Sequence, residues 1–167
     1  LTDEMLHRFD ERAPVYDREN RFFTEDFEEL RASGYLLAAV PVERGGSGLR
    51  LNQVMRLQQQ LAYVAPATAV AVNMHLYWTG MAADMARFGD TRGELILDQA
   101  ADGHVFAAGH GEAGNDVGLF GSTTQATKVP GGWEITGRKV FGSLSPVWTY
   151  AGFHAMDTSD PTAPKGS

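Results

Sequence analysis

The segment from Phe106 to Gly118 has the composition best suited to ligand binding in this chain. Glycines are interleaved there with small and polar residues, and glycine lets backbone N–H groups approach a bound molecule closely. Gly109, Gly111 and Gly114 could form a turn that aligns successive N–H groups toward a phosphate or another anion, without a basic side chain. An ordinary surface loop has the same composition, so the residues alone leave both interpretations open.

A β-hairpin is predicted directly after this loop. Residues 122–129 contain three Thr, end in Val129 and favour a strand, Pro130-Gly131-Gly132 favours a tight turn, and residues 133–141 favour the returning strand. The hairpin would return Gly142 and Ser143 toward the end at which the glycine-rich loop lies. A further strand is expected at residues 148–156.

The first hundred residues supply the helices that must position this segment. Their apolar residues recur at helical spacing, and cap residues mark the ends. We expect a helix capped by Thr2 and ended or bent near Arg12 by Pro14, a second capped by Thr24 and stopped by Gly34, a third capped by Asn52, a fourth from about Ala67 to Phe88, and a fifth from the capping box Thr91–Glu94 to Gly103. Residues 35–49 are expected to form a buried extended run that ends in a glycine turn.

Composition changes at Gly103, where short alternating runs of Thr, Gly, Val and aromatic residues replace helix formers. We therefore predict a helical domain over residues 1–103 and the first part of a β-domain over residues 104–167. The expected fold class is α+β: an all-α domain followed by an incomplete antiparallel β-domain. His75, in the middle of the fourth helix, is interpreted as a hydrogen-bonded core residue, because no second metal-binding residue lies at helical spacing from it.

Bulk composition excludes several functions. The formal charge of -7 and the scattered fourteen Lys and Arg argue against nucleic acid or an anionic membrane as the main partner. The absence of cysteine excludes disulfides and thiolate metal sites. The first residues lack the pattern of a signal peptide, and residues 64–81 are too interrupted to span a bilayer, so a cytoplasmic protein without membrane insertion is expected.

Three motifs resemble those of the acyl-CoA dehydrogenases. Residues 40–49 are similar to that family's Val-Pro-x-Glu-x-Gly-Gly-x-Gly-Leu turn, and Gly109 to Asp116 occupies the place of its Thr-Glu-Pro-x-x-Gly-Ser-Asp loop. Ile135 to Ser143 is similar to the strand that follows in the family. The resemblance covers almost the whole chain and implies the first half of such an enzyme, without the C-terminal helical bundle.

The resemblance also implies a bound FAD. Seven residues fall at the family's flavin-contacting positions: Phe106, Ala108 and Gly109 along the isoalloxazine ring, Gly114 and Asn115 beside the flavin and its pyrophosphate, Phe141 packed on the ring, and Ser143 near flavin N5. A hydroxyl at N5 suits the atom on which electron density grows during reduction.

The chain departs from the family pattern at the loop, where Gly109-His110-Gly111 replaces Thr-Glu-Pro and Asn115 replaces Ser. The family's catalytic base is a carboxylate in the C-terminal bundle, and no Glu or Asp of this sequence matches it. No catalytic residue and no metal ligand is therefore assigned. A solvent-exposed position and a position near the flavin are both open for His110.

The function implied by the resemblance is α,β-dehydrogenation of an acyl-CoA in fatty acid metabolism, with hydride transfer to flavin N5. Electrons would leave to a carrier of the electron-transfer flavoprotein type, and the subunits would form a dimer or tetramer. Two alternatives stay open. One is a flavin monooxygenase of the same fold, acting on an aromatic or amino-sugar substrate and motivated by the changed loop. The other is a catalytically incomplete fragment or partner subunit.

Overall fold

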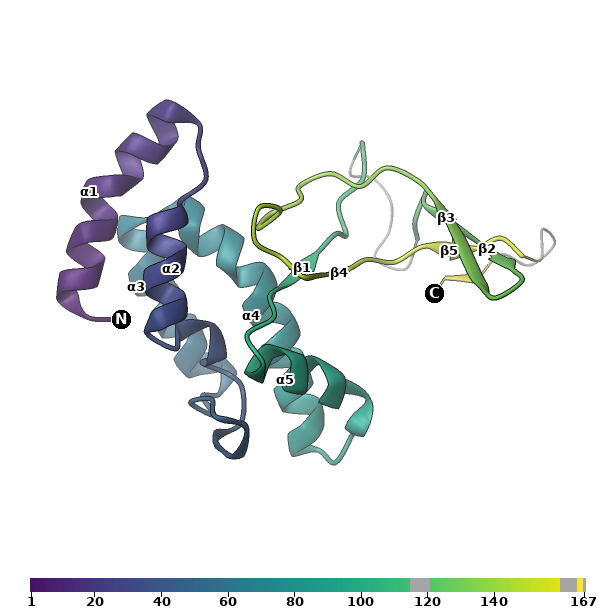
Figure 1. Ribbon diagram of the computed structural model, residues 1–167, viewed down its shortest axis with the longest axis horizontal. Helices are drawn as coiled ribbons and strands as arrows, with labels where there is room; N and C mark the ends of the chain where they lie inside the picture. Colours follow the sequence, from purple (N-terminus) through teal and green to yellow (C-terminus); the bar gives the residue numbers. More distant parts are fainter. Residues whose placement is uncertain (115–120, 160–164, 167) are drawn as a thin grey trace. The chain divides into compact units, whose positions relative to one another are not determined.

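The computed structural model describes residues 1–114, 121–159 and 165–166, and the chain divides into two compact units (Figure 1). The helical unit consists of Leu1–Ala107 and Ser143–Tyr150, and the β-unit consists of Ala108–Gly142 and Ala151–Ser167. The chain thus enters the β-unit, returns to the helical unit for eight residues, and enters the β-unit again. A helical N-terminal domain followed by a small partial sheet confirms the predicted fold class.

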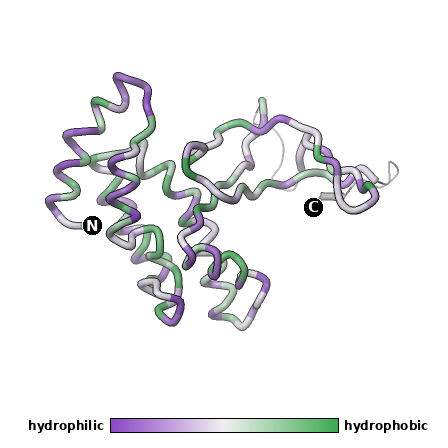
Figure 2. The backbone as a smooth tube through the Cα atoms, viewed as in Figure 1, coloured by the Kyte–Doolittle hydropathy of each residue, from purple (hydrophilic) through white to green (hydrophobic). Residues whose placement is uncertain are grey.

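The helical unit contains five α-helices: α1 (Asp3–Glu19), α2 (Thr24–Ala32), α3 (Leu51–Val64), α4 (Pro66–Arg87) and α5 (Glu94–Ala101). Hydrophilic and hydrophobic residues alternate along α1, as Figure 2 shows, and its buried face carries Met5, Phe9 and Tyr16. The longest helix, α4, packs against both α3 and α5 and buries small and apolar residues along most of its length. Its central place in the helical core confirms the sequence interpretation.

The start of α1 is as predicted, but its end is not. Thr2 caps the helix by accepting a 3.2 Å hydrogen bond from Met5 N. The expected stop near Arg12 is wrong, because α1 continues through Pro14 to Glu19. Proline removes one helical N–H, and contacts on either side of it hold the helix to α2: Arg12 pairs with Glu29 at 2.8 Å, and the Tyr16 hydroxyl lies 3.2 Å from Asp26 Oδ1.

Three other helix starts differ from the predicted caps. Helix α2 begins at Thr24 itself, with Phe23 at the cap position, and α3 begins at Leu51, one residue before the expected cap. A 3-10 turn, η3 (Thr91–Gly93), precedes α5, and Asp90 caps that turn by accepting from Arg92 N at 3.0 Å. At α3 and η3 the capping is supplied by the neighbouring residues Arg50 and Asp90, whereas α2 has no side-chain cap.

The segment between α2 and α3 is compact, so the predicted extended run is wrong. It contains two 3-10 turns, η1 (Tyr35–Leu37) and η2 (Val42–Arg44), and it folds back so that Gly48 N donates to Val40 O at 2.8 Å. Gly46 is required there, since an added Cβ would lie 2.1 Å from Val40 O. The close backbone approach explains the glycines without any ligand.

The β-unit is built on the predicted hairpin. Strands β2 (Gln125–Val129) and β3 (Gly132–Thr136) pair antiparallel around Pro130 and Gly131, although both are shorter than the sequence pattern indicates. Strand β2 also pairs in parallel with β5 (Met156–Asp157), which pairs antiparallel with β6 (Lys165–Gly166), so this sheet is mixed rather than antiparallel throughout. A second small sheet joins β1 (Phe106–Ala108) to β4 (Tyr150–Gly152), so the expected strand at 148–156 is divided between β4 and β5.

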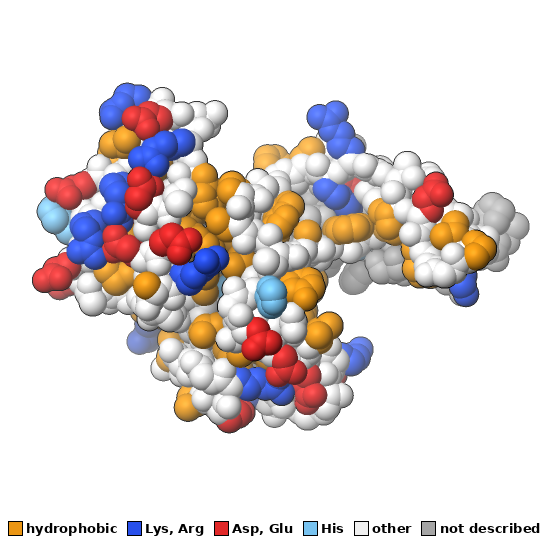
Figure 3. All heavy atoms as spheres, in the orientation of Figure 1, with side chains coloured by type: hydrophobic (Ala, Val, Ile, Leu, Met, Phe, Trp, Pro, Cys, Tyr) orange, Lys and Arg blue, Asp and Glu red, His pale blue; other side chains and the backbone are white. Residues whose placement is uncertain are grey.

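Charged side chains on the helical unit are mixed in sign. On the face that Figure 3 shows, basic and acidic groups lie interspersed over α1 and α2 and form no basic patch. Arg12 Nε lies 2.8 Å from Asp26 Oδ1, although its N–H is not aligned for a hydrogen bond.

None of the helices formed by the described residues is long and apolar enough to cross a membrane.

Candidate functional site

The root of the glycine-rich loop is fixed within the helical unit by two side chains of α4. His75 Nδ1 accepts a hydrogen bond of 3.1 Å from Phe106 N, and Trp78 Nε1 donates one of 2.9 Å to Ala107 O. His75 Nε2 lies 3.0 Å from Leu36 O, and a carbonyl only accepts, so the ring is the neutral Nε2–H tautomer. Burial lowers the pKa of His75 to about 4. The predicted hydrogen-bonded core histidine is confirmed.

A buried carboxylate fixes the loop itself within the β-unit. Glu112 is only 5% exposed, and Lys139 Nζ donates to its Oε1 at 2.6 Å. Three consecutive residues of the segment leading into β2 also donate to it: Ser122 Oγ at 2.5 Å, Thr123 N and Oγ1 at 2.7 Å each, and Thr124 N and Oγ1 at 3.3 and 3.1 Å. The hydrogen bond from Lys139, followed by that from Ser122, holds the pKa of Glu112 far below its usual range.

Two histidines meet beside this ion pair. Nδ1 of His110 lies 3.1 Å from Nδ1 of His154, and their rings stack with centroids 5.3 Å apart. Nε2 of His154 lies 2.8 Å from Gly121 O. The pKa of His110 is lowered, first by burial and then by the neighbouring His154 and Lys139. His110 is therefore part of a defined pair in the β-unit and is not an isolated loop side chain.

The segment that follows β3 carries unusual backbone geometry. Phe141 and Leu144 have φ values of 61° and 67°, in the left-handed region that bulky residues rarely adopt. Leu144 is buried, but Phe141 is 78% exposed, so core packing does not account for its conformation. Its ring lies close to the loop, because a Cβ added to Gly111 would come within 3.0 Å of Phe141 Cδ2. Strain of this kind collects at functional sites.

Residues 3–92, slightly more than half of the chain, match the acyl-CoA dehydrogenase N-terminal domain. The chain belongs to the acyl-CoA dehydrogenase family. It is 26% identical to the Bacillus subtilis protein YdbM over 85% of this chain and 38% of that protein. The name of YdbM assigns it provisionally to the acyl-CoA dehydrogenases. Similarity to L-evernosamine nitrososynthase of a Micromonospora species is 30% identity over 93% of this chain and 37% of the enzyme.

A solved structure of KijD3 in complex with FMN and dTDP-3-amino-2,3,6-trideoxy-4-keto-3-methyl-D-glucose has the same fold. It superimposes with a TM-score of 0.80 at 28% identity, over 98% of this chain and 40% of that one. The chain therefore spans about two fifths of the length of the relatives that it matches.

The residues that the family resemblance assigns to a flavin are distributed over both units. Phe106 and Ser143 belong to the helical unit, and Ala108, Gly109, Gly114 and Phe141 belong to the β-unit. Gly114 has a φ of 92°, a conformation that glycine adopts freely. Asn115 lies outside the described residues.

The sequence analysis did not identify four residues that shape the site: Trp78, Glu112, Lys139 and His154. Lys139 is part of the Ile135–Ser143 motif. A lysine at that position could have been used to predict an ion pair with a carboxylate of the loop. His154 gave no such signal, because it lies 44 residues from His110 in the sequence. No group of three or more His, Cys, Asp or Glu that could hold a metal ion occurs within residues 1–114, 121–159 and 165–166.

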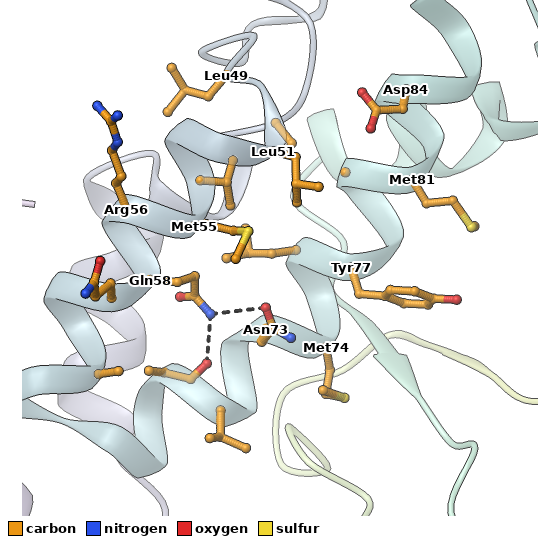
Figure 4. A pocket seen from close by; sticks show the side chains of 18 of the residues that line it. Leu49, Leu51, Met55, Arg56, Gln58, Asn73, Met74, Tyr77, Met81 and Asp84 are labelled. Atoms are coloured by element: carbon orange, nitrogen blue, oxygen red, sulfur yellow. Dashed lines mark hydrogen bonds between the residues drawn. The ribbon is translucent and has the colours of Figure 1, made fainter. Parts of the chain in front are cut away.

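The helical unit also has a groove of about 880 Å³ between α3 and α4 (Figure 4). Leu51 and Met55 of α3 and Tyr77 of α4 give it a largely apolar lining. Its polar lining residues include Arg56, Asp84 and Gln58, and Gln58 Nε2 donates to Ala69 O at 3.0 Å and to Asn73 Oδ1 at 3.2 Å. The groove therefore has the character of a largely apolar binding surface with charged residues among its lining.

Proposed function

We propose that this chain is part of a flavin-dependent oxygenase that oxidises the amino group of a nucleotide-linked amino sugar. The observation that supports it best is the 30% identity to a nitrososynthase over 93% of the chain. That similarity covers more of this chain than the match to YdbM. The replacement of Thr-Glu-Pro by Gly109-His110-Gly111 in the loop agrees with a reaction other than dehydrogenation.

The residues present fit a flavin. Phe141 holds an exposed aromatic ring in a strained conformation, and the ring packs so closely on Gly111 that an added Cβ would lie 3.0 Å from its Cδ2. We assign the flavin contacts to the positions named from the sequence: Phe106, Ala108, Gly109, Gly114, Asn115, Phe141 and Ser143. FMN is proposed in place of FAD, because the similar KijD3 structure contains FMN. When bound and reduced, the flavin supplies the electrons that activate oxygen.

The chain itself would order the loop and orient the substrate. The Glu112–Lys139 pair would hold the glycine-rich loop in one conformation, and the Ser143 hydroxyl would donate a hydrogen bond near flavin N5. The overall reaction converts an amine, oxygen, two electrons and two protons into a hydroxylamine and water. A second oxidation of the same kind would give a nitroso compound. Assembly into a dimer or tetramer and a cytoplasmic location are further parts of this proposal.

The test uses the protein produced from its complete gene, supplied with FMN, NADH and a separate flavin reductase. Oxygen consumption should depend on dTDP-3-amino-2,3,6-trideoxy-4-keto-3-methyl-D-glucose, and mass spectrometry should find a sugar that has gained oxygen at nitrogen. The same sugar nucleotide with a hydroxyl in place of the amine is the control. Equal oxygen consumption with both sugars would refute the proposal.

The second candidate is α,β-dehydrogenation of an acyl-CoA by bound FAD, with an electron-transfer flavoprotein as acceptor. Membership of the acyl-CoA dehydrogenase family favours it. Anaerobic bleaching of the flavin by acyl-CoA thioesters would support it and count against the oxygenase. A protein that binds no flavin and catalyses neither reaction would instead be the incomplete partner subunit considered above.

A further inference from the structure

The groove between α3 and α4 exposes large apolar side chains. Leu51 and Met55 of α3 and Val70 of α4 all line it, and they are 65%, 61% and 64% exposed. Single exposed apolar side chains are ordinary on a protein surface. These three, however, share one groove of about 880 Å³ with further apolar residues of both helices (Figure 4). A contiguous apolar area of this kind is typical of a surface that another molecule covers.

Gly80 lies in the same groove, in the interior of α4. Glycine is unfavourable inside a helix relative to alanine, so its presence needs a reason. Among the described residues, and apart from its chain neighbours and its own helix backbone, no heavy atom lies within 4 Å of the place that a Cβ of Gly80 would take. Packing within the described chain therefore does not require this glycine. A partner that approaches the backbone of α4 closely would require it.

The amide of Gln58, at the floor of the groove, is already hydrogen-bonded within the chain. Its Nε2 donates to Ala69 O and to Asn73 Oδ1, and its Oε1 accepts from the hydroxyl of Tyr35 at 2.6 Å. A polar small molecule would have to displace these bonds in order to use the amide. The floor therefore suits an apolar protein surface better than a polar ligand.

The charges of the groove favour a second copy of this chain as the partner. The whole chain carries a formal charge of -7, so two copies repel each other on average. The lining of the groove instead contains two arginines, Arg56 and Arg87, and one acidic residue, Asp84, to which Arg87 donates at 2.5 Å. Because charges farther apart than about 10 Å are largely screened at physiological salt, the local groups decide. This face has no excess of acidic groups and can approach its own copy.

We propose that the α3–α4 face joins two copies of this chain about a twofold axis, so that the two helix pairs form a four-helix bundle. Nineteen residues line the groove, close to the roughly 20–30 residues that each partner contributes to a standard interface. In a twofold dimer the same patch serves both copies, which makes one groove sufficient. The inference depends on no step of the proposed reaction, so either can fail without the other.

Single cysteines locate the contact, because the native chain has no cysteine. A twofold axis passes through the middle of the patch, where Met55 lies in Figure 4, and a residue there meets its own counterpart. Met55→Cys should therefore give a covalent dimer with a short bismaleimide. Tyr63→Cys, on the same helix, 85% exposed and outside the lining, is the matched control and should stay monomeric. Equal cross-linking of the two variants would overturn the inference.

Sedimentation equilibrium measures the strength of the contact. The chain should have twice its mass of 18.2 kDa at high concentration. Met55→Glu places a charge in the interface and should raise the Kd of the dimer about 100-fold or more. Gly80→Ala should keep its helical circular dichroism and raise the Kd about tenfold, because its methyl group lies in the contact and meets no atom of its own chain outside α4.

Phe88→Glu is the control for exposed apolar side chains in general. Phe88 is 89% exposed and lies outside the groove, so this variant should leave the Kd unchanged. A wild-type chain that stays monomeric at every concentration would overturn the inference. A dimer that Met55→Glu leaves intact, or that Phe88→Glu dissociates to the same extent, would overturn it too.

The same cysteine variants are then compared in the protein produced from its complete gene. Cross-linking of Met55→Cys but not of Tyr63→Cys supports the inference there. Protection of Met55→Cys from a monofunctional maleimide without cross-linking means that another part of that protein covers the groove, and labelling without cross-linking means that the groove is open. Either result overturns the inference. None of these measurements uses flavin or turnover, so oxygen consumption with the amino sugar still tests the proposed function separately.

Discussion

His75 Nδ1 accepts the backbone N–H of Phe106 at 3.1 Å, and this bond joins α4 to the strand that leads into the glycine-rich loop. The bond exists only while the imidazole is neutral, since a proton on Nδ1 would face the N–H of Phe106. A residue buried in the helical core thus fixes the first position of the segment to which the flavin contacts are assigned. Its titration should be visible in both stability and loop order.

The stability of the helical unit should fall between about pH 6.5 and pH 4. The pKa of His75 is lowered to about 4 in the folded protein, so the unfolded chain binds more protons in this window and acid favours unfolding. The full loss, reached below pH 4, is about 3 kcal/mol. Urea unfolding at a series of pH values measures it, and His75→Gln should flatten this part of the profile. An unchanged slope in the variant would contradict the assignment.

Lys139→Met should release the glycine-rich loop. The variant leaves the Glu112 carboxylate buried without its cation, which is strongly unfavourable. We expect proteolytic cleavage in the loop to accelerate about tenfold or more and the pKa of His110 to rise, because Lys139 lowers it. Lys128→Met, on the exposed strand β2, is the matched control. Equal cleavage rates in the two variants would show that the ion pair does not order the loop.

Gly137→Ala should destabilise the β-unit. An added Cβ would lie 2.4 Å from Thr124 Oγ1 and 2.7 Å from Thr124 Cα, and the Thr124 side chain is buried. Overpacking of this kind costs about 1–3 kcal/mol. Gly132→Ala in the same hairpin meets no atom within 4 Å and should stay within about 0.5 kcal/mol of the wild type. Chemical denaturation of both variants and the wild type measures these differences in the free energy of unfolding.

Phe141→Gly should separate stability from cofactor binding. Glycine relieves the backbone strain at φ 61°, and the exposed ring contributes little to the core, so the variant should be at least as stable as the wild type. If the ring packs on the flavin, the Kd for FMN should rise about tenfold. Phe88→Ala, which removes another highly exposed ring, in the helical unit, should leave the Kd unchanged. Flavin fluorescence titration provides the measurement.

The sequence predicted what depends on local pattern. The apolar spacing gave five helices, and Thr2 and Gly34 marked two of their ends correctly. The end of α1 was missed because the contacts of Arg12 and Tyr16 with α2, invisible in local sequence, outweigh one lost hydrogen bond at Pro14.

The candidate site likewise has features that local sequence predicts and features that it does not. The glycine-rich loop and Phe141 could be named from motifs, whereas the partners of Glu112 and His110 depend on long-range contacts. Lys139 lies 27 residues from Glu112, and His154 lies 44 from His110. The parallel pairing of β2 with β5 was missed for the same reason, since alternation of residues does not reveal strand direction.

The hydrogen bond from Trp78 to Ala107 O places an indole at the root of the loop. With Trp133 and Trp148 replaced by phenylalanine, Trp78 would be the one remaining tryptophan, and emission excited selectively from tryptophan would come from the contact between α4 and β1. The chain thus carries an intrinsic fluorescent probe where the glycine-rich segment begins. Its emission can report ordering of that segment in real time without any attached dye.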